Sequence, residues 1–327
     1  MQPEDTAALE LIAVADPRRS HELGSRWLRH MRSGDFGAAW EVSDEVLRVR
    51  SAQRCDHLPR HFQWVWNGES LHGKVVLIRC YHGLGDTIQF IRYALLVRKI
   101  ARRVIVWAQP ELQGLLGTVA GIDQLIPLTS SAPGVDYDVD VEVMELPHVF
   151  RSTIGTLPAP DKYLHVRGAP LPQDGNIHVG IVWRCGDWEP ERTVPVALLS
   201  SFAQMPGVTL HVLQRGAGLA ERPPDFGIVS GSDDLTAAAR TIAALDLMIS
   251  IDSMPAHLAA ALGVRTWILL QAESDWRWMD HSGDSPWYPT MRIFRQRERG
   301  DWTEVVNAVE RRLRNLAARR QENRGPG

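Results

Sequence analysis

The segment from Leu247 to Gly263 constrains the fold of this chain more than any other stretch. It begins with Leu-Met-Ile-Ser-Ile, continues through Asp252 and Ser253, and ends in a run rich in Ala and Leu. This pattern predicts a buried strand, a polar turn and a helix closed by Gly263, because glycine readily takes the left-handed conformation of a helix C-cap. In open α/β sheets, ligands bind where a strand ends and the next helix begins. We therefore expect Asp252 and Ser253 at such a site.

The start of this predicted helix suits a phosphate group. A helix N-terminus presents free N–H groups and the positive end of the helix dipole. His257 follows Ser253 by four residues, so both side chains share one face of the helix. A simpler interpretation stays open, because Asp and Ser are common N-caps, Pro255 is tolerated in a first turn, and a lone histidine is more often structural.

A second strand-to-helix turn lies upstream, within residues 74–93. There a β-branched strand leads into the sequence His-Gly-Leu-Gly-Asp at 82–86, and an amphipathic helix follows. The two glycines allow a tight turn and a close approach of the backbone to a ligand. Ile88 replaces the third glycine of a dinucleotide fingerprint, and the chain has no Gly-Lys-Ser/Thr of a P-loop here. Asp86 is therefore either a helix cap or a general base that faces a cleft.

Composition restricts the class of protein. The chain has 327 residues, 44% of them hydrophobic, and a formal net charge of −3. This length allows about two domains with full cores, and the charge argues against a dedicated nucleic-acid binder. The three cysteines match no metal or disulfide spacing. The start is polar and acidic, and no apolar run approaches the roughly 18 residues of a membrane helix. We expect a soluble, cytoplasmic protein with reduced thiols.

Hydrophobic spacing divides the chain into four parts. Residues 1–68 contain two helical stripes separated near Gly34, which resemble a helix–turn–helix unit of the tetratricopeptide type but are too short for a solenoid. Residues 69–168 and 169–300 each alternate strands with helices, which predicts α/β domains with doubly wound parallel sheets. A Pro- and Gly-rich linker lies at 155–176. Residues 301–327 are expected to form a C-terminal helix and a disordered tail.

Two Rossmann-like halves of this kind form a cleft that suits a transferase with two substrates. The individual elements follow from the period of the apolar residues. The expected strands are 74–80, 103–108, 123–127, 138–143, 177–183, 208–214, 226–229, 247–251 and 266–270. The expected helices are 86–102, 111–119, 195–204, 233–245, 255–262 and 302–318.

The motifs around both turns resemble glycosyltransferase family nine, the ADP-heptose:lipopolysaccharide heptosyltransferases. The similarity is greatest to the branch that follows tetratricopeptide repeats in many bacterial proteins. The stretches that carry the resemblance are 83–93, 179–184, 192–195, 212–214, 251–257, 275–278 and 284–292. The resemblance implies a GT-B fold and an inverting transfer of heptose, or a related sugar, from a nucleotide-diphospho-sugar to a hydroxyl acceptor. ADP-heptose is the donor that it favours, and lipopolysaccharide biosynthesis is the implied setting.

The resemblance also implies roles for residues at matching positions. Asp86 would be the general base, since a sugar hydroxyl is a poor nucleophile until its proton leaves. Two arginines would face the donor diphosphate, which a guanidinium binds through two parallel hydrogen bonds. On the acceptor side we expect His82, Gly83, Gly85 and Gln89. The expected donor-binding residues are Trp183, Arg184, Arg192, Gln214, Asp252, Ser253, Met254 and His257.

The chain departs from the family at two places. Met254-Pro255 stands where the family often has small residues, and Pro255 removes one N–H near the expected phosphate. Arg192 stands where the better known heptosyltransferases often have lysine. No metal and no cofactor are expected, because no Asp-x-Asp motif lies at either strand-to-helix turn and the nucleotide sugar is a co-substrate.

Simpler interpretations stay open for several of these residues. Trp183 fits a core position, Arg184 and Arg192 fit surface ion pairs, Gln214 fits a loop contact, and His82 fits a turn contact. For the whole chain, a nucleotide-sugar 2-epimerase and a non-catalytic binding or scaffold module are the alternatives. The acceptor is a glycan, a small molecule or a protein. Nucleic acid is not expected as a partner, whereas a homodimer through the N-terminal helices and peripheral membrane contact stay open.

Overall fold

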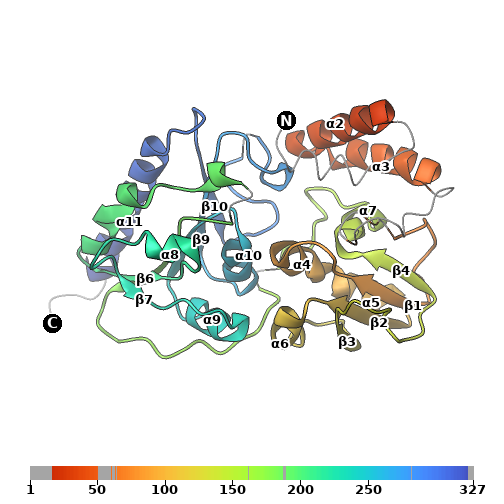
Figure 1. Cartoon of the computed structure of the whole chain (residues 1–327), viewed down its shortest axis with the longest axis horizontal. Coiled ribbons are helices and arrows are strands. Elements are labelled where there is room, and N and C mark those ends of the chain that lie inside the picture. The colour runs from red at the N-terminus through yellow and green to blue at the C-terminus, as the bar shows by residue number, and fades with distance from the viewer. Residues whose placement is uncertain are drawn as a thin grey trace. The chain divides into compact units, whose positions relative to one another are not determined.

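The computed structural model describes residues 17–50, 60, 63, 65–160, 162–186, 189–280 and 282–322 (Figure 1). The chain forms two compact units. The first comprises Met1–Ala159 and Asp275–His281, and the second comprises Pro160–Ser274 and Ser282–Gly327. Each unit contains one parallel sheet, as the alternation of strands and helices predicts. The domain boundaries expected at residues 68, 168 and 300 stay predictions. They did not anticipate that Asp275–His281 belongs to the first unit, whereas the residues on either side belong to the second.

The first unit is built on four parallel strands in the order β3-β2-β1-β4. Near-continuous apolar runs form the two central strands, as expected for strands covered on both faces. The strands are β1 (Val75–Arg79), β2 (Arg103–Ala108), β3 (Gln124–Pro127) and β4 (Val139–Glu142). The α-helices along this part of the chain are α4 (Leu84–Phe90), α5 (Ala94–Ile100), α6 (Gln113–Leu116) and α7 (Leu146–Val149).

The helix expected at 86–102 is interrupted. A 3₁₀ turn, η2 (Ile91–Tyr93), separates α4 from α5. At this turn the buried Arg92 donates from Nε to the carbonyl oxygen of Gln89, 2.6 Å away. That carbonyl would accept the N–H of residue 93 in a continuous α-helix. A side-chain contact therefore competes with the helical hydrogen bond at the point where the helix changes.

Two N-terminal helices, α2 (Pro17–Ser33) and α3 (Phe36–Arg50), belong to the first unit. The turn between them places Gly34 at φ +79°, a left-handed conformation that favours glycine. Trp40 donates from Nε1 to the carbonyl oxygen of Ser152 at 2.6 Å, and Arg50 pairs with Glu145 at 2.6 Å. These buried bonds fix α3 on the α/β part of the unit. The part of the expected helical region that falls in residues 1–16 lies outside the described residues.

The second unit is built on six parallel strands in the order β10-β9-β8-β5-β6-β7. The strands are β5 (Ile177–Val182), β6 (Val208–Val212), β7 (Ile228–Val229), β8 (Leu247–Ile251), β9 (Thr266–Leu270) and β10 (Met291–Arg295). The α-helices are α8 (Ala217–Ala220), α9 (Leu235–Ile242), α10 (Met254–Ala261) and α11 (Thr303–Glu322). Gly263 closes the end of α10 at φ +78°, as predicted.

Two elements of the second unit differ from the sequence-based expectation. Residues 196–204 form a long 3₁₀ helix, η6 (Val196–Gln204), in place of the α-helix expected at 195–204. Its bonds span three residues, including Leu198 N–H to Pro195 and the Ser200 hydroxyl to Ala197. Strand β10 was not predicted, because exposed Arg292 interrupts its apolar pattern at the sheet edge.

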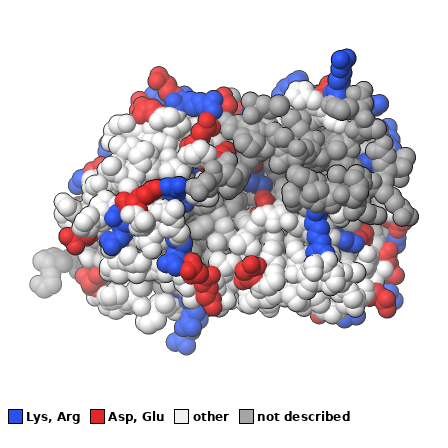
Figure 2. Space-filling view, viewed as in Figure 1, with Lys and Arg blue, Asp and Glu red and all other residues white. Residues whose placement is uncertain are grey.

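Charged side chains of both signs are intermixed on the face shown in Figure 2. This distribution fits the formal net charge of −3. Among the residues whose structure is described, no helix combines the length and the apolar character needed to cross a membrane.

Candidate active site

The residues of the candidate site form two groups, one in each unit. The Asp86 group consists of His82, Asp86, Gln89, Glu142 and Arg277 in the first unit. The Asp252 group consists of Glu189, Arg192, Asp252, Ser253, Met254, His257 and Tyr288 in the second unit. Each group is described by itself.

Asp86 lies in the first turn of α4, and each of its carboxylate oxygens has one partner. Oδ2 accepts the backbone N–H of Gly83 at 3.0 Å. One oxygen of Asp86 therefore contributes to the cap of α4, as the simpler interpretation predicts. Oδ1 accepts from Nη2 of Arg277 at 2.7 Å. The side chain of Asp86 is 22% exposed. Because each carboxylate oxygen carries two lone pairs, Asp86 keeps the capacity to accept a proton.

Arg277 comes from the segment Asp275–His281, and aromatic packing fixes that segment on the first unit. It lies in the 3₁₀ turn η7 (Trp276–Trp278), where Asp275 Oδ1 accepts the N–H of Arg277 at 2.9 Å. The ring of Trp276 packs edge-on against Trp27, 5.1 Å between centroids, and stacks at 6.3 Å from Phe90. The motif at 275–278 contributes to the family resemblance but did not predict a role for Arg277. Its position between two tryptophans was the available indication.

Glu142 is a second carboxyl group of the Asp86 group, and sequence reasoning missed it. It is the last residue of β4, paired in register with Arg79 at the end of β1, and is 2% exposed. Oε2 accepts the N–H of Met144 at 2.7 Å and lies 3.8 Å from Nε2 of His82. Burial, together with the charge of Glu145, raises the pKa of Glu142 well above its ordinary value. A glutamate at the end of a predicted strand was the indication in the sequence.

The four residues expected on the acceptor side have distinct environments. The carbonyl oxygen of His82 accepts from Gln109 Nε2 at 2.7 Å, which fixes the turn. Gly83 has φ −64°, which any residue adopts, so the expected need for a tight turn is corrected. A Cβ atom there would lie 3.0 Å from Asp86 Oδ2, so a larger residue would crowd this carboxylate. Gly85 is the second residue of α4.

Gln89, the fourth of these residues, is fully buried on α4. Within the described part of the chain, neither its amide nitrogen nor its amide oxygen has a hydrogen-bond partner. Residues 86 and 89 share a helix face by their spacing. A buried amide without partners carries a free-energy cost that a bound water or hydroxyl group would relieve.

Asp252 is the centre of a buried polar group that follows β8. Arg192 donates from Nη1 to its carbonyl oxygen at 3.2 Å and lies 3.6 Å from Oδ2. Arg192 also pairs through Nε with Glu189. Arg192 therefore forms ion pairs, as the simpler interpretation predicts. The expected surface position was wrong, because Arg192 and its partners are buried. Two carboxylates and one guanidinium leave this set with a formal charge of −1.

His257 on α10 is 3% exposed, and both of its ring nitrogens face a polar partner. Nδ1 lies 2.9 Å from the hydroxyl of Tyr288, and Nε2 lies 3.7 Å from Asp252 Oδ1. The structure thus brings His257 and Asp252 together, as expected. The contact of His257 with Tyr288 was not predicted, because 31 positions separate the two residues in the sequence.

The start of α10 is the half-exposed part of this group. Ser253 occupies the N-cap position, but its hydroxyl accepts no N–H of the helix among the described residues. It lies 3.4 Å from the carbonyl oxygen of Ile251 and 3.3 Å from Ser250 Oγ. The capping interpretation is therefore wrong for this side chain. Met254 and Pro255 are also partly exposed.

Trp183, Arg184 and Gln214 follow the carboxyl ends of β5 and β6. Gln214 Oε1 accepts the N–H groups of Trp183 and Arg184 at 3.1 and 2.9 Å, so its amide fixes a loop. Arg184 pairs with Glu221. The indole of Trp183 is fully buried and packs edge-on against Phe226. The donor contact expected for Trp183 is corrected, because core packing occupies its ring.

Metal ligands are not gathered in either group. Among the described residues, no three side chains of His, Cys, Asp or Glu are arranged to hold a metal ion. Of the cysteines, Cys80 is buried and Cys185 is half-buried, and Cys55 lies outside the described residues.

Comparison with solved structures gives the class of fold. The glycosyl transferase family 9 protein of Veillonella parvula DSM 2008 matches with a TM-score of 0.54 and 14% identity, over 74% of this chain and 90% of that chain. The dodecameric, iron-containing heptosyltransferase TibC of enterotoxigenic E. coli, solved with ADP-D-β-D-heptose, matches with a TM-score of 0.53 and 12% identity, over 76% of this chain and 78% of TibC. The two parallel α/β domains thus form the GT-B fold of glycosyltransferases.

A family model matches part of the sequence. Residues 196–306 match the model of glycosyltransferase family 9 (heptosyltransferase). The predicted resemblance to this family is thereby confirmed over residues 196–306. Protein FlbA of Caulobacter vibrioides is 24% identical over 341 residues. That alignment covers 87% of this chain and 53% of FlbA, so the chain spans about half the length of this relative.

Proposed function

We propose that this protein is an inverting glycosyltransferase in which Asp86 is the general base. The observation that carries the proposal is the placement of the Asp86 carboxylate at the start of α4, partly exposed and oriented by Arg277 and Gly83. A base held in this way takes the proton of an acceptor hydroxyl. The hydroxyl oxygen then bonds to the anomeric carbon, and the bond from that carbon to the diphosphate oxygen breaks. One displacement without a covalent intermediate inverts the anomeric centre.

The Asp252 group is proposed to bind the nucleotide-diphospho-sugar. Its buried ions have a formal charge of −1, so they do not by themselves attract a diphosphate. The half-exposed start of α10 supplies the attraction instead, through the helix dipole and the backbone N–H of Met254, since Pro255 has no N–H and Ala256 donates to the carbonyl oxygen of Ser253. Arg192 and His257 would then fix Asp252 for contacts with the donor sugar. The same field stabilises the negative charge that develops on the leaving diphosphate.

ADP-heptose is the donor that we propose, because TibC is described in complex with ADP-D-β-D-heptose. The acceptor is proposed to be a hydroxyl group of a glycan or another molecule. Among the acceptor-side residues, the buried Gln89 amide has the capacity to donate to and accept from a hydroxyl group or a bridging water. We further propose that the reaction proceeds without a metal or cofactor, in the cytoplasm.

A donor panel tests this function directly. The full chain is heated with and without ADP-heptose and UDP-, GDP- and dTDP-sugars, and unfolding is followed. Ligand at a hundred times its dissociation constant adds about 2.7 kcal/mol to the stability. We expect ADP-heptose to give the largest shift. Product formed from the donor alone, by epimerisation, or no stabilisation by any nucleotide sugar would contradict the proposal.

A further inference from the structure

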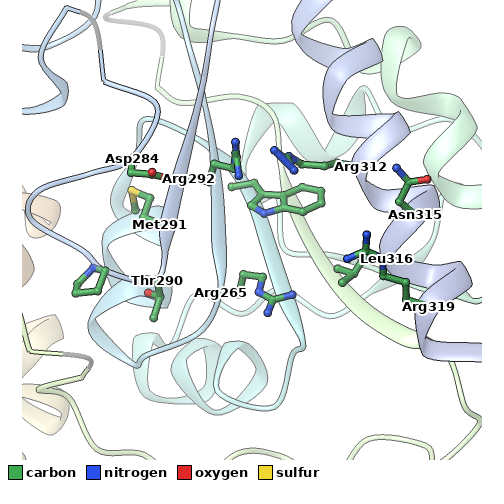
Figure 3. Close-up of a pocket in the computed structure, with 11 residues that line it drawn as sticks. Arg265, Asp284, Thr290, Met291, Arg292, Arg312, Asn315, Leu316 and Arg319 are labelled. Atoms are coloured by element: carbon green, nitrogen blue, oxygen red, sulfur yellow. The ribbon is translucent and has the colours of Figure 1, made fainter. Parts of the chain in front are cut away.

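A basic pocket lies between the edge of the six-stranded sheet and α11 in the second unit (Figure 3). Its volume is about 330 Å³. The basic pocket is lined by Arg265, Trp267, Arg292, Arg312, Asn315 and Arg319, together with residues 284, 289–291 and 316. In Figure 3, Arg292 from β10 and Arg312 from α11 extend toward each other.

The basic pocket lies at the amino ends of two parallel strands. Arg265 directly precedes β9, and Thr290 directly precedes β10. Trp267 and Arg292 are register partners of these strands. The Asp252 group instead follows the carboxyl end of β8, which is parallel to β9. The basic pocket and the Asp252 group therefore occupy opposite ends of the same sheet.

Within the described part of the chain, the positive charges that line the basic pocket outnumber the negative ones. Among the residues with described positions, none of Arg265, Arg292, Arg312 and Arg319 forms an ion pair. Asp284 contributes one carboxylate to the lining, so four positive charges and one negative charge leave a formal charge of +3. Other arginines of α11 are paired: Arg314 with Glu310 and Arg320 with Asp246.

Four guanidinium groups around one cavity repel each other unless an anion lies among them. A guanidinium presents a planar fork of donors that matches the oxygens of a phosphate. A flat arginine-rich surface would fit many anions, but this site is concave and has the volume of a small-molecule site. Trp267 and Asn315 add an indole and an amide to the lining, which suit the organic part of such a ligand.

We propose that the basic pocket binds a small ligand that carries a diphosphate group. A nucleoside diphosphate carries about three negative charges near neutral pH, close to the formal charge of the site. This ligand site is separate from the proposed donor site, and its existence does not depend on the transfer reaction. Inorganic pyrophosphate is the minimal probe, and ADP adds the organic part.

Calorimetric titration of pyrophosphate into the full chain tests the proposal. The double variant Arg312→Gln/Arg319→Gln removes two guanidiniums of the basic pocket. The control Arg311→Gln/Arg320→Gln removes the same charge from α11 without altering the lining. All four positions are exposed, and thermal unfolding verifies that both variants fold. We expect the pocket variant to weaken one binding event at least about tenfold and the control to change it less than about twofold, because charge-assisted bonds are lost only in the former.

A second readout identifies the location. Phenylglyoxal modifies accessible arginines, and mass spectrometry reports which arginines pyrophosphate protects. Protection of Arg265, Arg292, Arg312 and Arg319, and tighter binding of ADP that Trp267→Phe weakens, are the expected results. Equal pyrophosphate affinity in the two double variants would overturn the proposal. Binding to vesicles of anionic lipid without any binding of pyrophosphate would overturn it as well.

Discussion

Arg277 donates a hydrogen bond to Asp86 across 2.7 Å, although 191 residues separate them in the chain. The guanidinium is 8% exposed and the carboxylate 22%, so the pair lies at the border between core and solvent. Trp276 fixes the position of Arg277 by packing on α2 and α4 through Trp27 and Phe90. A short segment from late in the sequence thus sets the environment of the proposed base.

Replacing Arg277 tests this dependence. We expect Arg277→Gln to lower the rate of sugar transfer about tenfold or more, because Asp86 keeps only its bond to Gly83 and loses its orientation. The variant should also lose about 1–3 kcal/mol of unfolding free energy, since a charge-assisted hydrogen bond disappears. Steady-state kinetics and thermal unfolding measure both effects. Arg277→Lys keeps the charge without the planar fork and should be intermediate; a wild-type rate in Arg277→Gln would show that Asp86 needs no orientation.

The buried carboxyl group of Glu142 predicts a dependence of stability on pH. Burial raises its folded-state pKa well above the ordinary 4.5, so the folded protein binds more protons than the unfolded chain between these two pKa values. The resulting stabilisation is complete below about pH 4.5 and is lost as pH rises through the folded-state pKa. Glu142→Gln stays neutral and keeps an oxygen for the Met144 N–H. We therefore expect this variant to lose less stability than the wild type as pH rises.

Thermal melts of wild type and Glu142→Gln, from about pH 4 to about pH 9, measure this difference. Glu111→Gln is the matched control, because Glu111 is an exposed carboxyl of the same unit. The control should follow the wild-type curve. Parallel curves for Glu142→Gln and the wild type would show that Glu142 ionises as freely in the folded protein as in the unfolded chain.

Ser253 gives a prediction that separates binding from stability. Its hydroxyl does not cap α10, so Ser253→Ala should change the unfolding free energy by less than about 0.5 kcal/mol. Asp234 does cap α9, accepting the N–H of Ala237 at 2.9 Å, and Asp234→Ala should cost about 1 kcal/mol. In calorimetry with ADP-heptose, Ser253→Ala should bind about 3- to 10-fold more weakly, the loss of one hydrogen bond. Unchanged donor affinity in Ser253→Ala would place the donor elsewhere.

Metal removal tests the chemistry of the proposed reaction. A carboxylate takes the proton of the acceptor hydroxyl, and a helix N-terminus stabilises the charge of the leaving diphosphate. Because neither role needs a metal ion, transfer is expected to survive dialysis against a chelator. TibC is described as iron-containing, which makes this comparison informative. Transfer rates before and after dialysis, with metal analysis of the protein, provide the measurement. Activity that disappears with the metal and returns with added iron would disprove metal independence.

Sequence patterns predicted the central strands and the ends of α10 well, because those depend on local properties. β2, β8 and β9 have the predicted bounds, since continuous apolar runs bounded by polar residues fit strands buried on both faces. The edge strand β10 was not predicted, because it is defined by its pairing with β9 and not by its own pattern of apolar residues. The break between α4 and α5 depends on a contact of the Arg92 side chain, which the spacing of apolar residues does not predict.

The candidate site was predictable to a similar degree. The sequence predicted the places of Asp86, Asp252 and His257 because these residues follow strands or lie near the starts of helices, and their roles stay predictions. Arg277 and Glu142 were missed because their importance comes from contacts and burial that only the folded chain creates. Trp183 shows the opposite error, in which a residue near the right strand end points into the core.

The central claim is that Asp86 removes the proton of the acceptor hydroxyl. The most direct measurement is the transfer rate of Asp86→Asn together with its affinity for ADP-heptose. Asn keeps the size of the side chain and one oxygen, which accepts from Gly83 or from Arg277 but not from both in this geometry, and it does not act as a base. Asp136→Asn, at an exposed position of the same unit, is the control. We predict transfer reduced by about a hundredfold or more with donor affinity unchanged; a transfer rate equal to that of the wild type would contradict the account.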